Sequence, residues 1–185
     1  MLYDICKKCR LCETASIACV DDDTRQEDKK ADVIVVLDMP SVMDRKKLLT
    51  DESSKHLASV VEELTDLNVL YTSVLHCRPN DGKAAKRHIN YCKQILLDLF
   101  AYHQPKIVFV VGNVALATVL GETSISKWSG IAVERDGVKY MPVYHPAYVM
   151  RNRHIMDDWL NSFIQIFSGD DGVAKTYYEK IFIQD

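Results

Sequence analysis

The stretch that decides the fold is KIVFVVGNVALATVL, residues 106–120. Its first six residues form an apolar run rich in β-branched side chains, which is typical of a strand buried on both faces. Gly112 ends this run, and we expect residues 113–120 to form a helix. A glycine that joins a buried strand to a helix is typical of a parallel β–α unit. We therefore predict a strand at 106–111 that turns directly into a helix.

The same alternation continues on both sides of this unit. We expect further strands at 31–37, 69–75 and 138–144, and further helices at 53–67, 84–102 and 154–167. Strands that alternate with helices indicate a parallel sheet covered on both faces. The prediction is an α/β fold of three layers, α/β/α, with a four-stranded, mainly parallel central sheet. In such a sheet the functional site lies at the carboxyl ends of the strands.

Length and composition predict a single domain. The chain has 185 residues, 48% of them apolar, which is enough for an ordinary core. We place the domain at 1–167 and a linker with a C-terminal tail at 168–185, because SGDDGV at 168–173 is typical of a flexible link. No apolar run is long enough to cross a membrane. The net charge of −3 does not indicate nucleic-acid binding, so any such binding would rely on local basic clusters.

Four cysteines suggest a metal or cluster site. Cys6 and Cys9 form a C-x-x-C pair in CKKCRLC, Cys77 follows the strand in VLYTSVLHC, and Cys92 lies in the next helix. The pair can direct two thiolates at one centre from a single turn of chain. Disulfides are the weaker alternative, since we expect no signal peptide and a reducing cytoplasm, bacterial or phage-infected. The other alternative is that Cys77 and Cys92 are ordinary buried thiols.

The ordered set of motifs resembles the iron–sulfur uracil-DNA glycosylases, family 4 of that superfamily. The motifs are CKKCRLC at 6–12, LDMPS at 37–41, YTSVLHCRP at 71–79, INYC at 89–92, VFVVGNVA at 108–115 and YHPAYVMR at 144–151. The resemblance implies a structural 4Fe–4S cluster held by Cys6, Cys9, Cys77 and Cys92. Cys12 lies close enough in sequence to compete as a ligand.

The resemblance also implies roles for residues at the strand ends. His145 matches the histidine that stabilises the departing base anion, and Asp38 matches a catalytic glutamate but is one methylene shorter. Ser73 stands where the family reads uracil with an asparagine, and a hydroxyl cannot make both contacts of a carboxamide. Leu48 or Leu49 falls where an aromatic stacks on uracil. Base binding is thus expected to involve Pro40, Leu49 and Ser73.

DNA contacts are expected around the same strand ends. The residues expected to bind the DNA backbone are Arg45, Lys46, Lys47, Arg151 and Arg153, with Tyr148 where the family inserts a wedge into the helix. Two functions follow. One is a glycosylase of weak activity on uracil or another damaged base, and the other is a non-catalytic DNA-binding accessory of a polymerase or another replication protein. An unrelated zinc-stabilised α/β protein is the third, least favoured alternative.

Overall fold

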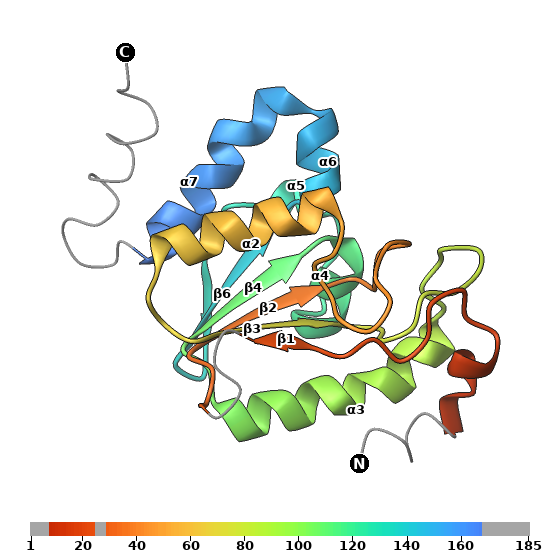
Figure 1. Ribbon diagram of the computed structural model, residues 1–185. Coiled ribbons are helices and arrows are strands. Elements are labelled where there is room, and N and C mark those ends of the chain that lie inside the picture. Colours follow the sequence, from red (N-terminus) through yellow and green to blue (C-terminus); the bar gives the residue numbers. More distant parts are fainter. Residues whose placement is uncertain (1–7, 25–28, 168–185) are drawn as a thin grey trace.

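The computed structural model describes residues 8–24 and 29–167. Its middle layer is a six-stranded sheet in the order β1-β3-β2-β4-β6-β5 (Figure 1). The strands are β1 (Asp23–Thr24), β2 (Val33–Leu37), β3 (Val69–Ser73), β4 (Ile107–Val111), β5 (Val133–Arg135) and β6 (Val138–Val143). The four predicted strands are the four parallel ones at the centre, and short β1 and β5 pair antiparallel at the two edges. The predicted α/β/α fold is confirmed, with two edge strands more than expected.

Helices cover both faces of this sheet. The α-helices are α2 (Glu52–Leu64), α3 (Lys86–His103), α4 (Asn113–Val119), α5 (Ile125–Trp128), α6 (Pro146–Arg151) and α7 (Met156–Phe167), with 3-10 turns η1 (Leu11–Glu13) and η2 (Arg153–Ile155). Within the described ranges, none of these helices has the length and apolar character needed to cross a membrane. The strand-then-helix unit predicted at 106–120 is present as β4 and α4.

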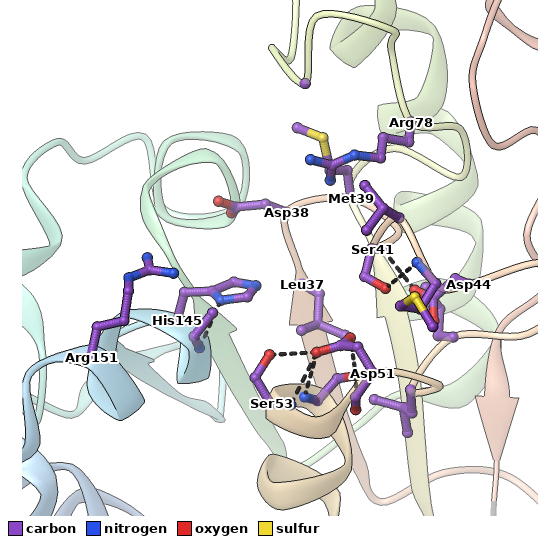
Figure 2. A pocket seen from close by; sticks show the side chains of 17 residues that line it. Leu37, Asp38, Met39, Ser41, Asp44, Asp51, Ser53, Arg78, His145 and Arg151 are labelled. Atoms are coloured by element: carbon purple, nitrogen blue, oxygen red, sulfur yellow. Dashed lines mark hydrogen bonds between the residues drawn. The ribbon is translucent and has the colours of Figure 1, made fainter.

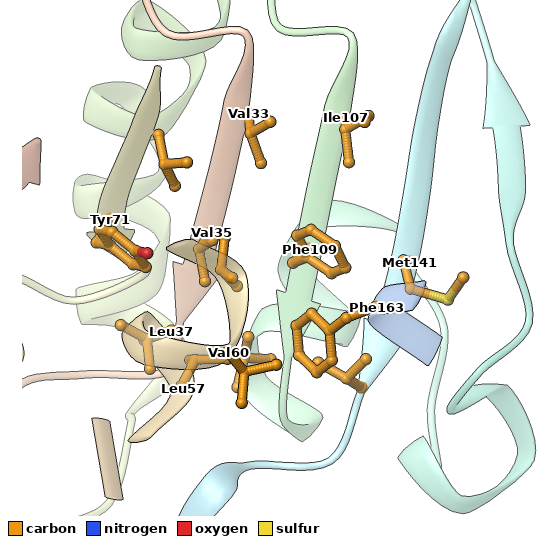
Figure 3. Packing of buried hydrophobic residues seen from close by; sticks show 14 of the residues in the cluster. Val33, Val35, Leu37, Leu57, Val60, Tyr71, Ile107, Phe109, Met141 and Phe163 are labelled. Carbon is orange, nitrogen blue, oxygen red and sulfur yellow. The ribbon is translucent and has the colours of Figure 1, made fainter. Parts of the chain in front are cut away.

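Alternating side chains divide the core into two parts. Val33, Val35 and Leu37 of β2 point to the face covered by α2, α6 and α7, where they pack with residues such as Phe109 and Phe163 (Figure 3). The intervening side chains of β2 point to the opposite face, which is covered by α3, α4 and α5. Every residue of β2, β3 and β4 is buried, as expected for a parallel sheet between two helical layers.

The strand order creates a crevice between β2 and β4. The chain leaves β2 through α2 on one face, whereas it leaves β4 through α4 on the other face. Because the two connections diverge, the carboxyl ends of these neighbouring strands are left uncovered between them, and ligands of open α/β sheets bind at such a point. The sequence places Asp38 directly after β2 and Gly112 directly after β4.

An N-terminal strap, defined here as residues 16–21, crosses the loops at this end of the sheet. Its backbone bonds to residues 76–78 with N···O distances of 2.7–3.0 Å. At its other end, the Asp21 N–H donates to the Lys46 carbonyl at 2.7 Å, and the Leu48 N–H donates to the Asp21 carbonyl at 3.3 Å. The strap therefore joins the loop after β3 to the loop after β2.

Candidate active site

Asp38 lies at the crevice and is held by the first turn of α4. Its Oδ1 accepts a hydrogen bond from the Ala115 N–H at 2.8 Å. Gly112, with φ 93°, makes room for this carboxylate, because a Cβ built there would lie 2.8 Å from Asp38 Oδ2. Burial raises the pKa of Asp38 to about 6, against the opposing effect of the Ala115 and Val114 N–H groups. Asp38 is thus a partly desolvated carboxylate, and it also caps a helix.

This placement predicts an unusual stability effect for Asp38→Asn. A carboxyl group whose pKa is raised in the folded state makes the protein less stable as pH rises from about 4 through about 6. An asparagine oxygen still accepts from Ala115 but carries no charge. We expect the variant to gain about 1–3 kcal/mol in free energy of unfolding at pH 8 and little at pH 4, because one pKa unit corresponds to about 1.4 kcal/mol. Urea denaturation at the two pH values measures this.

Asp51→Asn is the matched control, for which we expect a change in the free energy of unfolding of opposite sign at pH 8. Asp51 caps α2 and accepts hydrogen bonds from Ser53 and Ser54. Burial opposes ionisation of Asp51, but these bonds prevail and lower its pKa. Its stabilising effect is therefore present at neutral pH and is lost on acidification, so Asp51→Asn should be destabilising at pH 8. If Asp38→Asn were also destabilising at pH 8, the Asp38 carboxylate would be a net stabilising cap and not a desolvated charge.

His145 presents one ring nitrogen to the same crevice. It is the N-cap of α6, and its Nδ1 accepts a hydrogen bond from the Ala147 N–H at 3.2 Å. An accepting Nδ1 in a neutral imidazole requires the proton to be on Nε2. Burial lowers the pKa of His145, the charge of Asp51 opposes this, and Arg151 and Arg78 reinforce it. The geometry and the pKa shift together favour a neutral ring with an Nε2–H donor.

Two adjoining pockets share Asp38 and His145. The first, of about 470 Å³, is also lined by residues of the loop after β2 and by the start of α2 (Figure 2). In Figure 2 the His145 ring projects into the space bounded by Asp38, Leu37 and Ser53. The second, of about 460 Å³, lies toward α4 and α5 and is lined by Asn113, Tyr144 and Tyr148 among others. Asp38 and His145 thus stand between two spaces, each large enough for a small ring.

The predicted base-binding residues are only partly brought together. Leu49 lines the first pocket. Pro40 is buried outside the pocket lining, and its carbonyl accepts a hydrogen bond from Arg78 Nη1 at 3.0 Å. Ser73 is fully buried, and its hydroxyl donates to the Leu75 carbonyl at 2.8 Å. Neither Pro40 nor Ser73 belongs to the lining of the first pocket, and their contacts with a base stay predictions.

The predicted DNA-binding residues surround the pockets unevenly. Arg151 lines the first pocket, and Tyr148 lines the second, where its ring stacks on Tyr144 with centroids 5.2 Å apart. The three basic residues at 45–47 are exposed on the loop after β2. Arg153 lies elsewhere, in a pocket beside His56 and Met156. Arg153 is exposed there, and its contact with DNA stays a prediction.

Arg78 is a further candidate for the site, to which the sequence analysis gave no functional role. Its guanidinium is fixed by the Pro40 carbonyl and lines the first pocket opposite Arg151. A Cβ at Gly82 would lie 3.3 Å from Arg78 Nη2, so this loop passes close to the guanidinium. The available signal was its position three residues after Leu75, at the end of the predicted strand 69–75.

The cysteines of the described ranges converge at one end of α3. Cys77 and Cys92 are buried together with Leu11 and Leu75, and Cys9 and Cys12 pack against them. Burial raises the pKa of Cys9 and of Cys12, and the neighbouring thiols, Cys92 for Cys9 and Cys19 for Cys12, raise it further. The backbone N–H of Cys19 donates to Cys77 Sγ at 3.2 Å. Cys6 lies outside the described residues.

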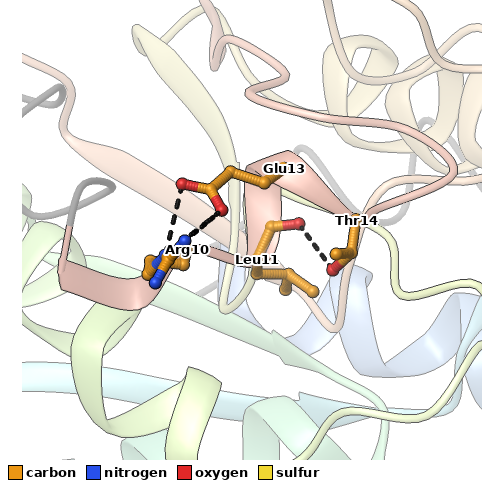
Figure 4. A network of polar contacts seen from close by, with 4 residues as sticks. All are labelled: Arg10, Leu11, Glu13 and Thr14. Atoms are coloured by element: carbon orange, nitrogen blue, oxygen red, sulfur yellow. Dashed lines mark hydrogen bonds and ion pairs between the residues drawn. The ribbon is translucent and has the colours of Figure 1, made fainter.

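Local structure explains how the N-terminal thiols reach this cluster. Arg10 adopts a left-handed backbone conformation between Cys9 and Cys12 and forms an ion pair with Glu13 at 3.0 Å. Figure 4 shows this pair and the hydrogen bond from Thr14 Oγ1 to the Leu11 carbonyl, which close the η1 turn. Cys9, Cys12, Cys19, Cys77 and Cys92 are all free thiols.

Four of the described cysteines lie together in an apolar cluster with Leu11 and Leu75. Burial raises the pKa of Cys77 to about 12, so a neighbouring cation would be needed to make it a thiolate at neutral pH. His76 Nε2 lies 2.9 Å from Asp22 Oδ1, and its Nδ1 is buried without a hydrogen-bond partner in the described part of the chain. Within that part, no three metal-ligating side chains are already arranged around one point. The thiols are gathered in one region, but without a metal-like geometry.

Comparisons with known proteins agree with the fold. The model of the uracil DNA glycosylase superfamily matches residues 24–167, a span that contains Asp38, His145, Cys77 and Cys92. A DNA polymerase of Bacillus phage SP01 is 27% identical over 138 residues, which is 71% of this chain but only 15% of the polymerase. With most of its length and its whole sheet core inside the match, the chain belongs to the uracil DNA glycosylase superfamily.

Proposed function

We propose that the protein binds DNA and hydrolyses the N-glycosidic bond of uracil or another damaged base, with weak activity on uracil. The proposal is supported most by the position of His145. Its ring is held by the start of α6, and its neutral Nε2–H is directed into the crevice. A fixed donor of this kind stabilises the negative charge that develops on a departing base. The target nucleotide would first have to leave the base stack and enter the first pocket.

Asp38 supplies the complementary charge. When the base departs, the sugar develops positive charge, which a nearby carboxylate stabilises, and a water molecule must be placed to attack. With a pKa of about 6, Asp38 is mostly ionised at neutral pH. The Ala115 N–H fixes its orientation, so little reorganisation is needed during the reaction.

Weak activity on uracil follows from the groups that would read the base. The Ser73 hydroxyl is bound to Leu75, and Leu49 offers no aromatic ring for stacking. The polar groups that do line the pocket include Asp51 and Ser53, which belong to the α2 cap. A carboxylate accepts hydrogen bonds, and uracil presents both a donor and two acceptors. No carboxamide lines the first pocket in the described structure, so the pocket lacks the group that would pair with both the donor and an acceptor of uracil.

We further propose that a 4Fe–4S cluster is bound by Cys6, Cys9, Cys77 and Cys92. The convergence of Cys9, Cys77 and Cys92 and the absence of disulfides among the described thiols support it. The group would act structurally, cross-linking the N-terminus to α3 and to the loop that carries Arg78. Cys12 remains the competing fourth ligand, because it packs against the same cluster.

A second candidate is a non-catalytic accessory role in DNA replication. It is supported by the similarity to the phage DNA polymerase and by the buried position of Ser73. In this case the same crevice would hold DNA without cleaving a glycosidic bond, and a polymerase or another replication protein would be the partner.

One experiment separates the two candidates. A single-stranded oligonucleotide with one uracil is incubated with excess protein, and alkali then cuts any abasic site. Slow cleavage, with binding that weakens steeply as salt rises, is the result expected for the glycosylase. Binding without cleavage would support the accessory role. If no binding occurred at low salt, both candidates would be rejected.

A further inference from the structure

Val42 and Met43 form an exposed apolar tip at the mouth of the first pocket. Each is 61% exposed, and among the described residues they are the only two large apolar side chains that are both exposed and adjacent in the chain. Both line the pocket that contains Asp38 and His145. Exposed apolar surface has an unfavourable hydration free energy, so an apolar tip beside a binding pocket indicates a binding surface.

The tip is held in place and cannot fold back into the core without breaking several bonds. Asp44, only 2% exposed, accepts hydrogen bonds from the Ser41 N–H at 2.8 Å and from the Thr50 N–H at 3.0 Å. Ser41 Oγ accepts from the Met43 N–H at 3.0 Å. The loop is thus closed at its base by a buried carboxylate, and Val42 and Met43 stand at its apex.

Basic side chains lie close to the tip, beside a pocket that is also lined by three aspartates. Arg45, Lys46 and Lys47 follow it directly and are exposed. Arg78 and Arg151 line the same pocket. An apolar apex next to cations matches the chemistry of DNA, in which apolar base faces alternate with anionic phosphates.

We propose that Val42 and Met43 insert into the base stack of DNA beside an extruded nucleotide, while the cations at 45–47 hold the phosphates of that strand. This inference rests on the proposed DNA binding and adds a second apolar contact to Tyr148, which lines the other pocket. The tip fills the space that the extruded base leaves, and so it favours the extruded state over the stacked one. A flat apolar contact with a protein partner would use the same side chains without unstacking any base.

The test uses a duplex that contains a stable abasic-site analogue with 2-aminopurine as its neighbour, so that no catalysis is needed. Binding of the wild-type protein should increase 2-aminopurine fluorescence, because this base brightens when it is unstacked. We expect the double variant V42S/M43S to bind about tenfold more weakly. At saturation it should lose most of the fluorescence increase, and its salt dependence should be unchanged. V42L/M43L, which keeps an apolar tip, should behave like the wild type.

The double variant R45S/K46S is the matched control from the same loop. It should reduce the slope of log K against log salt concentration by the amount expected for roughly two phosphate contacts. The fluorescence increase at saturation should stay intact. All variants alter exposed side chains, and equal melting temperatures check their folding. Failure of the wild type to bind DNA would reject the proposed function itself. Normal binding with unchanged fluorescence in V42S/M43S would overturn the insertion, and would leave a protein partner as the occupant of the tip.

Discussion

His145→Ala is expected to lower the single-turnover rate of uracil excision by about 10²- to 10³-fold, the usual effect of removing one donor to a developing anion. The Nε2–H that faces the crevice is lost, and no other imidazole lines either pocket around Asp38 in the described structure. The rate is measured with the uracil oligonucleotide at protein excess, which separates chemistry from product release.

His145→Asn distinguishes loss of the donor from loss of the helix cap. The His145 Nδ1 bond to the Ala147 N–H caps α6, and asparagine is also a good N-cap, whereas alanine is not. We expect His145→Ala to lower the free energy of unfolding by about 0.5–2 kcal/mol and His145→Asn to preserve it. Both should lose excision, because the shorter amide does not reach the position of Nε2. Retained excision in either variant would show that His145 is only a cap.

Cys77→Ser is expected to abolish iron binding. Wild-type protein purified without oxygen should be brown with about four irons per chain, which is the content of the proposed cluster. The variant should be colourless and should unfold at a much lower temperature, since a bound cluster contributes its binding free energy to folding. Iron analysis, visible absorption and thermal unfolding measure these effects.

Cys19→Ser is the control for this experiment. Cys19 is exposed, and its backbone N–H, which serine keeps, donates to Cys77 Sγ, while its thiol also lies beside Cys77 and Cys12. Because Cys19 is not one of the four proposed ligands, the iron content of Cys19→Ser should be unchanged, and loss of iron would show that Cys19 is a ligand. Cys6→Ser and Cys12→Ser then decide the fourth ligand, and loss of iron in Cys12→Ser alone would show that the assignment to Cys6 is wrong. Zinc in place of iron in the wild-type protein would contradict the cluster.

The buried parts of the fold were predictable because the sequence signals there are strong. The runs that became β2 and β4 consist almost wholly of β-branched residues, and only a doubly covered parallel sheet buries both faces of such runs. β1 and β5 are two and three residues long, too short to carry a periodic pattern. Helix α6 begins at Pro146, where proline is favourable in the first turn, and a single helix at 154–167 was expected in this region without it.

The sequence signal for the candidate site was strongest at the strand ends, where Asp38 follows β2 directly and His145 follows β6 after one residue. Matching a motif position does not reveal which way the last side chain of a strand points, and the Ser73 hydroxyl is directed to the Leu75 carbonyl. Arg78 was missed as a pocket residue because its placement depends on a long-range bond to the Pro40 carbonyl, which has no local signature. The apex at 42–43 carries no periodic pattern, and its exposure depends on the buried carboxylate of Asp44.

The N-terminal strap has a consequence for where the folding unit begins. The superfamily match starts at residue 24, beyond residues 16–21 that join the loop carrying Arg78 to the loop carrying the apolar tip. A fragment cut at residue 24 would leave the Lys46 carbonyl and the backbone of residues 76–78 without these hydrogen bonds, although it would retain every strand of the parallel core. The span matched by the superfamily is thus shorter than the part of the chain that we expect to fold as one unit. A truncated protein should therefore keep residues 16–21.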